Sequence, residues 1–262
     1  MLNIAVRAAR SAGSLIIRHV ERVDALEITR KGMHDFVTAV DQNAERVIID
    51  ALHRAYPSHG FVAEESGRHD GDDFVWVIDP LDGTTNFLHG FPQFCVSIAL
   101  KHRGRLEYSV VFDPLRQEIF TATRGGGAQL NDRRIRVSKQ KGLDEALLGT
   151  GFPLHALAEL DTYLATLKAL VPSAAGIRRG GSAALDLAYV AAGRLDGYWQ
   201  FYLKEWDYAA GALLVQEAGG LLSSPGGGED WYKSGNIVAG TPKVHAGVLQ
   251  SIQSHLTDSV RE

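Results

Sequence analysis

The chain opens with two amphipathic segments, in which apolar side chains recur at helical spacing. Residues 2 to 20 gather apolar positions on one face, and residues 38 to 55 repeat the pattern until Pro57 interrupts it. Thr38 stands three residues before Asp41, a spacing typical of a capping pair at a helix start. We therefore expect two surface helices, the second of which begins next to a carboxylate.

The following part of the chain carries short apolar runs of the kind that buried strands have. Two of them, at residues 61 to 65 and 74 to 79, end in carboxylates. From about residue 94 to 138, apolar and polar positions alternate between turn signals, which is typical of an antiparallel meander. A sheet is therefore expected after the two helices.

After about residue 140, strand patterns alternate with helix patterns. Strands are expected at ALLGTGF, LDGYWQF and NIVAG, and helices near residues 156 to 170 and 182 to 193, from Trp206 and from Pro242. No linker separates the approximate halves, residues 1–140 and 141–262, and no repeat relates them. We expect an α+β fold in which residues 1–262 form a single compact unit.

Composition narrows the class of protein. The 262 residues are enough for a large core, and 45% of them are hydrophobic. A net charge of −4 gives no overall positive field for nucleic acid. No apolar run approaches the roughly 18 residues of a membrane span, so we expect a cytoplasmic protein without membrane contact. The single cysteine, Cys95, is expected in the core of a chain from a reducing compartment.

The most informative stretch of the sequence is DPLDGTTN at residues 79 to 86. A buried strand delivers Asp79, Pro80 opposes further ladder pairing, and Asp82 is expected in a tight loop. Converging carboxylates repel each other unless they are protonated or bind a cation, and oxygen donors favour Mg²⁺ or Ca²⁺. Backbone N–H groups at Gly83, where a helix is expected to begin, would then hold a phosphate.

Two further acidic positions extend this pattern. Glu64 ends an apolar run, and Asp207 can lie in the first turn of a tightly packing helix. Plainer interpretations exist: a solvated turn at residues 79 to 86, a loop start at Glu64, and a helix-dipole partner at Asp207. Four acidic groups at element ends, without a cluster of His or Cys, favour several Mg²⁺ ions over zinc.

Two distant signatures resemble those of the inositol monophosphatase family, and above all its bacterial inositol-1-monophosphatases. The first joins EES at residues 64 to 66 to DPLDGTTN, and the second is WDYAAG at residues 206 to 211. The resemblance extends from Lys31-Gly32 and Asp35 to the stretch at residues 182 to 199. It implies a layered αβαβα sandwich of the sugar-phosphatase type that acts as one catalytic unit, forms a homodimer and is sensitive to lithium.

The resemblance also assigns roles to individual residues. Two or three Mg²⁺ ions would be held by Glu64, Asp79, the main-chain carbonyl of Leu81, Asp82 and Asp207, with Asp79 bridging two of them. The catalytic residues would be Glu64, Thr84 and Asp41. Glu64 and Thr84 would orient and deprotonate the attacking water, and Thr84 would be hydrogen-bonded to Asp41. The substrate would contact Leu81, Asp82, Gly83, Thr84, Gly181, Ser182, Ala183, Gln200 and Asp207.

Gln200 departs from the family pattern, which commonly has Glu at this position. The amide oxygen still accepts a hydrogen bond, but the negative charge is lost and two N–H donors are added. The departure bears on the recognition of inositol hydroxyls and leaves the predicted phosphatase chemistry untouched.

The expected function is a Mg²⁺-dependent phosphatase for a small polyol phosphate, first of all myo-inositol 1-phosphate. Fructose-1,6-bisphosphatase, histidinol-phosphate phosphatase and 3′-phosphoadenosine 5′-phosphate phosphatase are alternatives among relatives of this family. A regulatory role, in contact with RNA polymerase or other transcription and RNA machinery, is an alternative of another class. The basic patch at residues 133 to 136 is expected at a solvated strand edge, and Arg178 and Arg179 could face either phosphate or a dimer partner.

Overall fold

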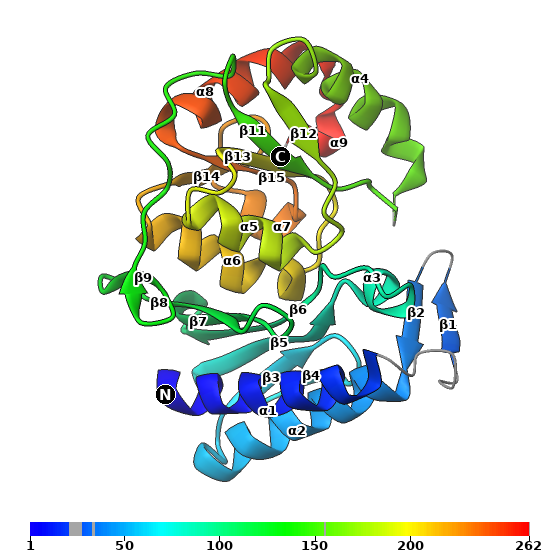
Figure 1. Cartoon of the computed structure of the whole chain (residues 1–262), viewed down its shortest axis with the longest axis vertical. Helices are drawn as coiled ribbons and strands as arrows, with labels where there is room; N and C mark the ends of the chain where they lie inside the picture. The colour runs from blue at the N-terminus through cyan, green and yellow to red at the C-terminus, as the bar shows by residue number, and fades with distance from the viewer. Residues whose placement is uncertain (21–27, 33–34, 155, 262) are drawn as a thin grey trace.

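The computed structural model describes residues 1–20, 28–32, 35–154 and 156–261. Figure 1 shows five layers stacked along the long axis: a pair of helices, a large sheet, a central helical layer, a smaller sheet and an outer helical layer. This arrangement confirms the predicted α+β fold with αβαβα order. No helix of the described chain has the length and apolar character that crossing a membrane requires.

The first layer consists of the two expected amphipathic helices, α1 (Leu2–Val20) and α2 (Ala39–Ala55). Thr38 caps α2 as predicted: its hydroxyl accepts from the Val40 N–H, and its own N–H donates to Asp41 at 2.9 Å. Between the helices, β1 (Ile28–Gly32) and β2 (Asp35–Thr38) form an antiparallel hairpin that the sequence pattern does not predict.

The large sheet has the strand order β10-β9-β8-β7-β6-β5-β3-β4, and only β3 and β5 run parallel. The stretch from β6 to β10 is the predicted antiparallel meander. The strands are β3 (Gly60–Ala63), β4 (Gly67–His69), β5 (Phe74–Asp82), β6 (Cys95–His102), β7 (Arg105–Asp113), β8 (Glu118–Thr123), β9 (Gly127–Leu130) and β10 (Arg133–Arg134).

The prediction that Pro80 ends strand pairing, with Asp82 in a loop, is wrong. β5 continues through Pro80, and its pairing with β6 resumes where Asp82 faces Cys95. The register shifts between Asp79 and Asp82, because three steps along β5 match two along β6 between Ser97 and Cys95. A bulge of this kind places the residue without an N–H outside the ladder and redirects the neighbouring side chains.

The smaller sheet has the order β12-β11-β13-β15-β14 and mixes parallel with antiparallel pairs. Its strands are β11 (Leu147–Thr150), β12 (Gly176–Arg178), β13 (Gly197–Gln200), β14 (Leu221–Ser223) and β15 (Ile237–Gly240). The sequence pattern predicts β11, β13 and β15 but not the three-residue edge strands β12 and β14.

Helices cover both faces of the smaller sheet (Figure 1). α5 (Ala183–Ala191) and α6 (Glu205–Glu217) lie between the two sheets, while α4 (Leu160–Leu170) and α8 (Pro242–Ile252) lie outside. One hydrophobic cluster contains residues of the large sheet, the central helices and the smaller sheet together. The other short helices of the described residues are α3 (Thr84–Leu88), η2 (Leu157–Glu159), α7 (Trp231–Ser234), η3 (Gln253–His255) and α9 (Asp258–Arg261).

Candidate active site

The predicted acidic residues reach one region of the interior from different elements. Asp79 and Asp82 lie near the end of β5, and Glu64 directly follows β3, where its N–H donates to the Ile78 carbonyl at 3.2 Å. Asp207 lies in the first turn of α6 and accepts from the Lys204 N–H at 2.8 Å, which confirms the plainer interpretation of it as a helix N-terminal partner. The parallel pairing of β3 with β5 brings the first three residues to the same sheet edge.

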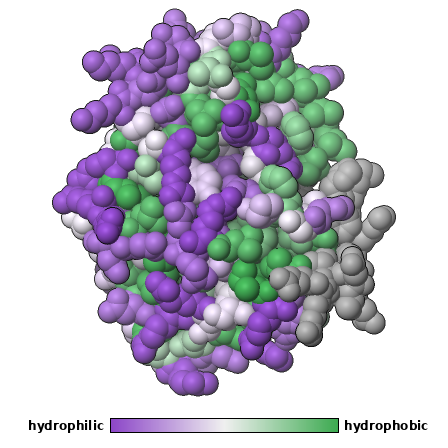
Figure 2. All heavy atoms as spheres, viewed as in Figure 1, coloured by the Kyte–Doolittle hydropathy of each residue, from purple (hydrophilic) through white to green (hydrophobic). Residues whose placement is uncertain are grey.

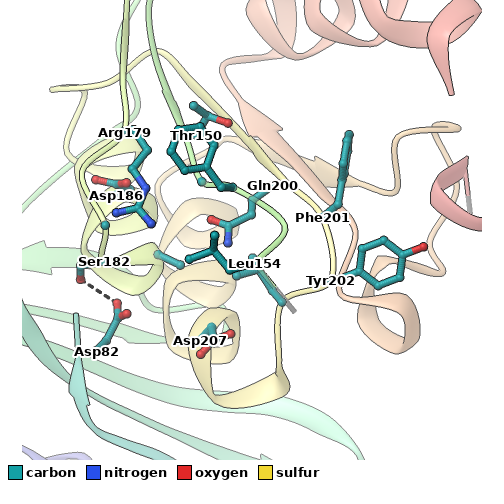
Figure 3. A pocket seen from close by; sticks show the side chains of 15 residues that line it. Asp82, Thr150, Leu154, Arg179, Ser182, Asp186, Gln200, Phe201, Tyr202 and Asp207 are labelled. Carbon is teal, nitrogen blue, oxygen red and sulfur yellow. Dashed lines mark hydrogen bonds between the residues drawn. The ribbon is translucent and has the colours of Figure 1, made fainter. Parts of the chain in front are cut away.

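A cavity of about 130 Å³ opens beside these residues, between the start of α5, the end of β13 and the start of α6 (Figure 3). Leu81, Gly83 and Thr84 belong to the adjoining end of β5 and start of α3. The predicted substrate residues that line the cavity are Asp82, Gly181, Ser182, Ala183, Gln200 and Asp207.

Asp82 joins the large sheet to the central helical layer. Its Oδ2 accepts from the Ser182 hydroxyl at 2.6 Å and from the Ala184 N–H at 2.8 Å (Figure 3). Burial raises the pKa of this carboxyl, and the hydrogen bonds from Ser182 and Ala184 oppose the shift. The side chain is therefore fixed before any ligand arrives.

Asp79 is a strongly perturbed member of the acidic group. It is 2% exposed, and its Oδ1 accepts from the Leu81 N–H at 3.0 Å. Burial raises its pKa well above the usual range, and the charges of Glu64, Asp82 and Asp207 raise it further. The four predicted metal ligands are thus electrostatic neighbours, and a bound cation would relieve the repulsion among them.

The chemistry of this donor set fits Mg²⁺. It offers carboxylates and a backbone carbonyl, whereas the nearby Cys95 is buried and burial raises its pKa, which disfavours the thiolate. Within the described residues, no group of three or more His, Cys, Asp or Glu side chains is arranged so that it could by itself hold a metal ion. Mg²⁺ keeps several of its waters and takes only a few protein oxygens, so a Mg²⁺ site here would depend on water and the backbone carbonyl as well as on carboxylates.

Thr84 and Asp41 meet as the family resemblance implies. The Thr84 hydroxyl donates to Asp41 Oδ1 at 3.0 Å and lies 3.1 Å from the Leu81 carbonyl oxygen. The other carboxylate oxygen of Asp41 accepts from the Thr38 N–H at 2.9 Å and from its hydroxyl at 2.6 Å. One fully buried carboxylate therefore caps α2 and orients Thr84, although 43 residues separate the two partners.

Gly83 occupies a turn of the site that favours glycine. It precedes α3 with a φ of 98°, in the left-handed region that favours glycine. A Cβ atom there would lie 2.9 Å from the Gln93 carbonyl oxygen. A side chain at this position would therefore displace the backbone that leads into Thr84.

Two buried acidic residues of the site escape the sequence analysis. Glu45, 3% exposed, accepts from the N–H groups of Glu65 and Ser66, both at 2.8 Å, and so fixes the turn that carries Glu64. Asp186, also 3% exposed, lines the cavity, and burial together with the charge of Asp82 raises its pKa well above the usual range. In each case the available signal is an acid within the apolar stripe of a helix.

Gln200 is held from within the protein. The Tyr198 hydroxyl, two residues earlier on β13, donates to its Oε1. On the other side the amide lies against Gly151, where a Cβ atom would come within 1.9 Å of the same oxygen. The substitution of Glu by Gln thus changes an anchored group whose orientation the protein determines.

Other predictions concern residues around the site. Cys95 is fully buried, and Arg133 and Arg134 are exposed on the edge strand β10, both as expected. Arg178 ends β12, whereas Arg179 stands at the rim of the cavity with its guanidinium 5.2 Å from the centre of the Phe152 ring. Arg179 is therefore the member of the pair that faces the site.

The two layered sheets, with helices between and around them, are the fold that the resemblance to one family of phosphatases implies. A model of the inositol monophosphatase family matches residues 1–257. The chain belongs to the inositol monophosphatase family.

Individual relatives match along almost the whole chain. Nus factor SuhB of Pseudomonas aeruginosa is 57% identical over 267 residues, which span 100% of this chain and 98% of that protein. The extragenic suppressor protein suhB from Bartonella henselae has a solved structure with 44% identity and a TM-score of 0.94, covering 97% of this chain and 98% of its own. The structure of inositol monophosphatase from Anabaena (Nostoc) sp. has 37% identity and a TM-score of 0.87, covering 97% and 95%.

Proposed function

We propose that the protein is a Mg²⁺-dependent phosphatase that hydrolyses small polyol phosphate monoesters, first of all myo-inositol 1-phosphate. One observation carries the proposal: the acidic group around the buried Asp79 adjoins both the Thr84–Asp41 hydrogen bond and a small polar cavity. Mutual repulsion among carboxylates is costly in a protein interior, and a divalent cation offsets that cost and can in turn bind the anionic phosphate of an ester.

The proposed ligands for two or three Mg²⁺ ions are Glu64, Asp79, the Leu81 carbonyl, Asp82 and Asp207. Bound Mg²⁺ would supply Lewis acidity and neutralise the charge of the phosphate. The N–H groups of Gly83 and Thr84 would donate to phosphate oxygens at the start of α3. The protein itself then contributes mainly position and fixed dipoles, as phosphoryl transfer requires.

Thr84 and Glu64 are the proposed water-handling groups. Because the Thr84 hydroxyl donates its hydrogen bond to Asp41, its lone pairs can accept a hydrogen bond from a water molecule. Glu64, held by the turn that Glu45 anchors, would accept the water proton. Asp41 acts through Thr84 and is therefore a positioning residue in this scheme.

The polyol end of the substrate would lie against Gly181, Ser182, Ala183 and Gln200. Since the Ser182 hydroxyl already donates to Asp82, it can offer only acceptor capacity to a substrate hydroxyl. The N–H groups of the α5 start are directed to Asp82 in the same way. Substrate contacts here would be few, which suits a phosphatase that reads a small ring or chain.

A phosphate-release screen tests this function. The purified chain is assayed on myo-inositol 1-phosphate, fructose 1,6-bisphosphate, histidinol phosphate and 3′-phosphoadenosine 5′-phosphate, each with Mg²⁺ and with EDTA. We expect release that depends on Mg²⁺, is greatest on inositol 1-phosphate and is lost in Asp79→Asn. Asp50→Asn, an exposed change of the same kind on α2, is the control. No release from any substrate would refute the proposal.

A second candidate function is a role in transcription, favoured by the relative of 57% identity that is named a Nus factor. Such a role would use the surface and would not need turnover. Binding of immobilised protein to purified bacterial RNA polymerase, measured by biolayer interferometry, tests it. We expect Asp79→Asn to bind as the wild type does. Absence of any binding to polymerase or its elongation complexes would argue against this candidate.

We also propose that the protein forms homodimers in the cytoplasm. The α4 apolar face, defined as Leu157, Leu160, Leu164 and Val171, is 36 to 58% exposed, and at helical spacing these side chains lie on one side. Figure 2 shows a largely hydrophobic area in the region of α4. Apolar patches of this kind favour burial against a second copy. Light scattering should show a dimer that Leu160→Asp with Leu164→Asp converts to a monomer; a monomeric wild type would refute this.

A further inference from the structure

The cavity of the candidate active site is bounded on one side by Tyr202 and Leu203, which lie just after β13 and are called the 202–203 wall below. The same two residues also line a second, larger cavity of about 460 Å³. Residues that are common to two separate cavities form the partition between them. The space that a ligand of the active site can enter therefore depends on this wall.

The backbone of the 202–203 wall is held from behind by the turn at residues 235 and 236. The Leu203 N–H donates to the Gly235 carbonyl at 3.0 Å, and the Tyr202 N–H donates to Oδ1 of the fully buried Asn236 at 2.9 Å. Gly235 has a φ of 71°, and a Cβ atom there would collide with the Leu203 carbonyl oxygen. A shorter side chain at residue 203 would therefore leave the backbone of the wall in place.

Tyr202 adopts a backbone conformation that bulky side chains disfavour. Its φ of 59° lies in the left-handed region, where such a residue persists only if surrounding contacts hold it. Figure 3 shows its side chain pointing away from Gln200. The phenol is hydrogen-bonded to Glu159, which also accepts from the Ser259 hydroxyl at 2.6 Å. The wall is thus tied to α4 and to the C-terminal segment, and its position is fixed.

Leu203 provides the apolar side chain of the wall. It is 7% exposed and belongs to the same hydrophobic cluster as Tyr208 and Trp231. The second cavity is lined by Tyr208 and Tyr232 and by the cation of Lys101. Aromatic side chains beside cations suit a planar base. Space and partners for a large substrate group therefore exist next to the active site, and Leu203 lies between.

We propose that Leu203 is a specificity-determining residue that restricts the active site to compact phosphate monoesters. Esters whose alcohol part is one small ring or chain, such as myo-inositol 1-phosphate, remain within the first cavity, and nucleotides are excluded because their base cannot pass the wall. Tyr202 is the positioning residue that keeps the wall in place. The inference rests on the proposed phosphatase function and narrows its substrate class.

A matched pair of substrates tests this inference. Ribose 5-phosphate and adenosine 5′-monophosphate share the phosphate and the pentose, and they differ in the adenine. We expect the wild type, in Mg²⁺, to have a kcat/KM at least about tenfold higher on ribose 5-phosphate. Leu203→Ala should raise the value for adenosine 5′-monophosphate relative to that for ribose 5-phosphate about tenfold, because the base can then reach the second cavity. Equal values in the wild type, or an unchanged ratio in Leu203→Ala, would overturn the inference.

Further variants separate specificity from general damage, which would lower both kcat/KM values together. Leu203→Met nearly conserves the side-chain volume and should keep the wild-type ratio. Leu221→Ala makes the same truncation at a leucine of β14 that is 45% exposed, and should also leave the ratio unchanged. If Leu203→Ala does not fold, Leu203→Val opens the same wall less and should raise the ratio about threefold; no rise would overturn the inference.

The role of Tyr202 has its own test. Tyr202→Phe keeps the ring but removes the hydroxyl that is bound to Glu159, so the wall is held less firmly. The ratio should shift in the same direction as in Leu203→Ala, by a smaller factor and through KM on adenosine 5′-monophosphate. An unchanged ratio would overturn the positioning role of Tyr202.

Failure of this inference is distinguishable from failure of the phosphatase proposal. If myo-inositol 1-phosphate and ribose 5-phosphate are hydrolysed but the ratio does not respond to residue 203, only the inference is overturned. If no substrate is hydrolysed, isothermal titration calorimetry in Mg²⁺ still tests it. Tighter binding of ribose 5-phosphate than of adenosine 5′-monophosphate, with a difference that shrinks in Leu203→Ala, supports the inference. Equal dissociation constants, or no binding of ribose 5-phosphate to the wild type, overturn it.

Discussion

Replacing Asp41 by asparagine separates the two tasks of one buried carboxylate. In the wild type, one oxygen accepts the N–H and hydroxyl of Thr38, and the other accepts the hydroxyl of Thr84. The amide oxygen of asparagine can keep both Thr38 bonds, so the cap of α2 survives. The amide nitrogen then faces Thr84 and donates to its hydroxyl oxygen. The Thr84 hydroxyl must therefore donate to the Leu81 carbonyl oxygen instead, which lies 3.1 Å away.

The expected changes in stability and in kcat follow from these altered hydrogen bonds. The two cap bonds are kept with a neutral acceptor, which costs about 1 kcal/mol for each, and the bond to Thr84 is reversed. Relief of a buried charge offsets part of the cost. We expect a stability loss of about 0–2 kcal/mol, or a Tm lower by at most about 8 °C. Activity should fall far more, by about a hundredfold or more in kcat, since the Thr84 lone pairs no longer face water.

Steady-state kinetics at saturating Mg²⁺ and thermal unfolding, both against Asp50→Asn on the same helix, measure the two effects. Thr84→Val, which lacks the hydroxyl, should show the same loss of kcat, and the double variant should lose little more because the residues act as one unit. Activity of Asp41→Asn within about threefold of the wild type, with an intact fold, would refute the proposed role of Thr84 in orienting water.

Four further outcomes are expected. Asp79→Asn should retain less than about a tenth of wild-type kcat yet melt no lower without Mg²⁺, because it removes a repelled buried charge. Li⁺ should inhibit uncompetitively or noncompetitively by occupying the Asp82–Asp207 position after turnover; purely competitive inhibition, or none at tens of millimolar, would contradict this. Burial lowers the pKa of His245, so at a pH just below the ordinary histidine pKa the unfolded chain binds a proton that the folded chain does not. The urea midpoint of unfolding should therefore fall from pH 7.5 to pH 5.5, and it should fall less in His245→Asn. Glu45→Ala removes the acceptor of the N–H groups of residues 65 and 66, so it should destabilise the fold by about 1–3 kcal/mol for each of them and also lower kcat. Urea titration measures the loss of stability.

The parts of the fold that the sequence predicts are those with long, regular patterns. Both amphipathic helices, the meander and the three inner strands of the smaller sheet are present close to their expected bounds. β12 and β14 have three residues each, too few for a period to be visible, and their place at the sheet edges comes from tertiary pairing alone. The course of β5 beyond Pro80 likewise depends on its partner β6, which the local turn signals do not reveal.

The candidate site also contains residues that the sequence predicts and residues that it does not. The acidic residues at element ends are visible in the sequence because carboxylates after apolar runs are unusual. Their anchors are not: Glu45 reaches a turn 20 residues away, and Tyr198 meets Gln200 only because alternate residues of a strand share a face. The Thr84–Asp41 pair follows from the family resemblance, since nothing in the spacing of 43 residues indicates contact.

The bonds from Asp82 to Ser182 and Ala184 also set a time order for synthesis of the protein. The partners are 100 and 102 residues apart, so a nascent chain that ends before α5 cannot yet hold Asp82 in place. β5 can pair with β6 well before then, because their residues are close in the chain. On the ribosome, the two carboxylates of this strand would pass through an interval in which they are folded into a sheet but lack the loop that fixes one of them. Any cation bound during that interval would meet a looser site than the finished protein offers, so the proposed Mg²⁺ ions would bind correctly only after the second half has been synthesised.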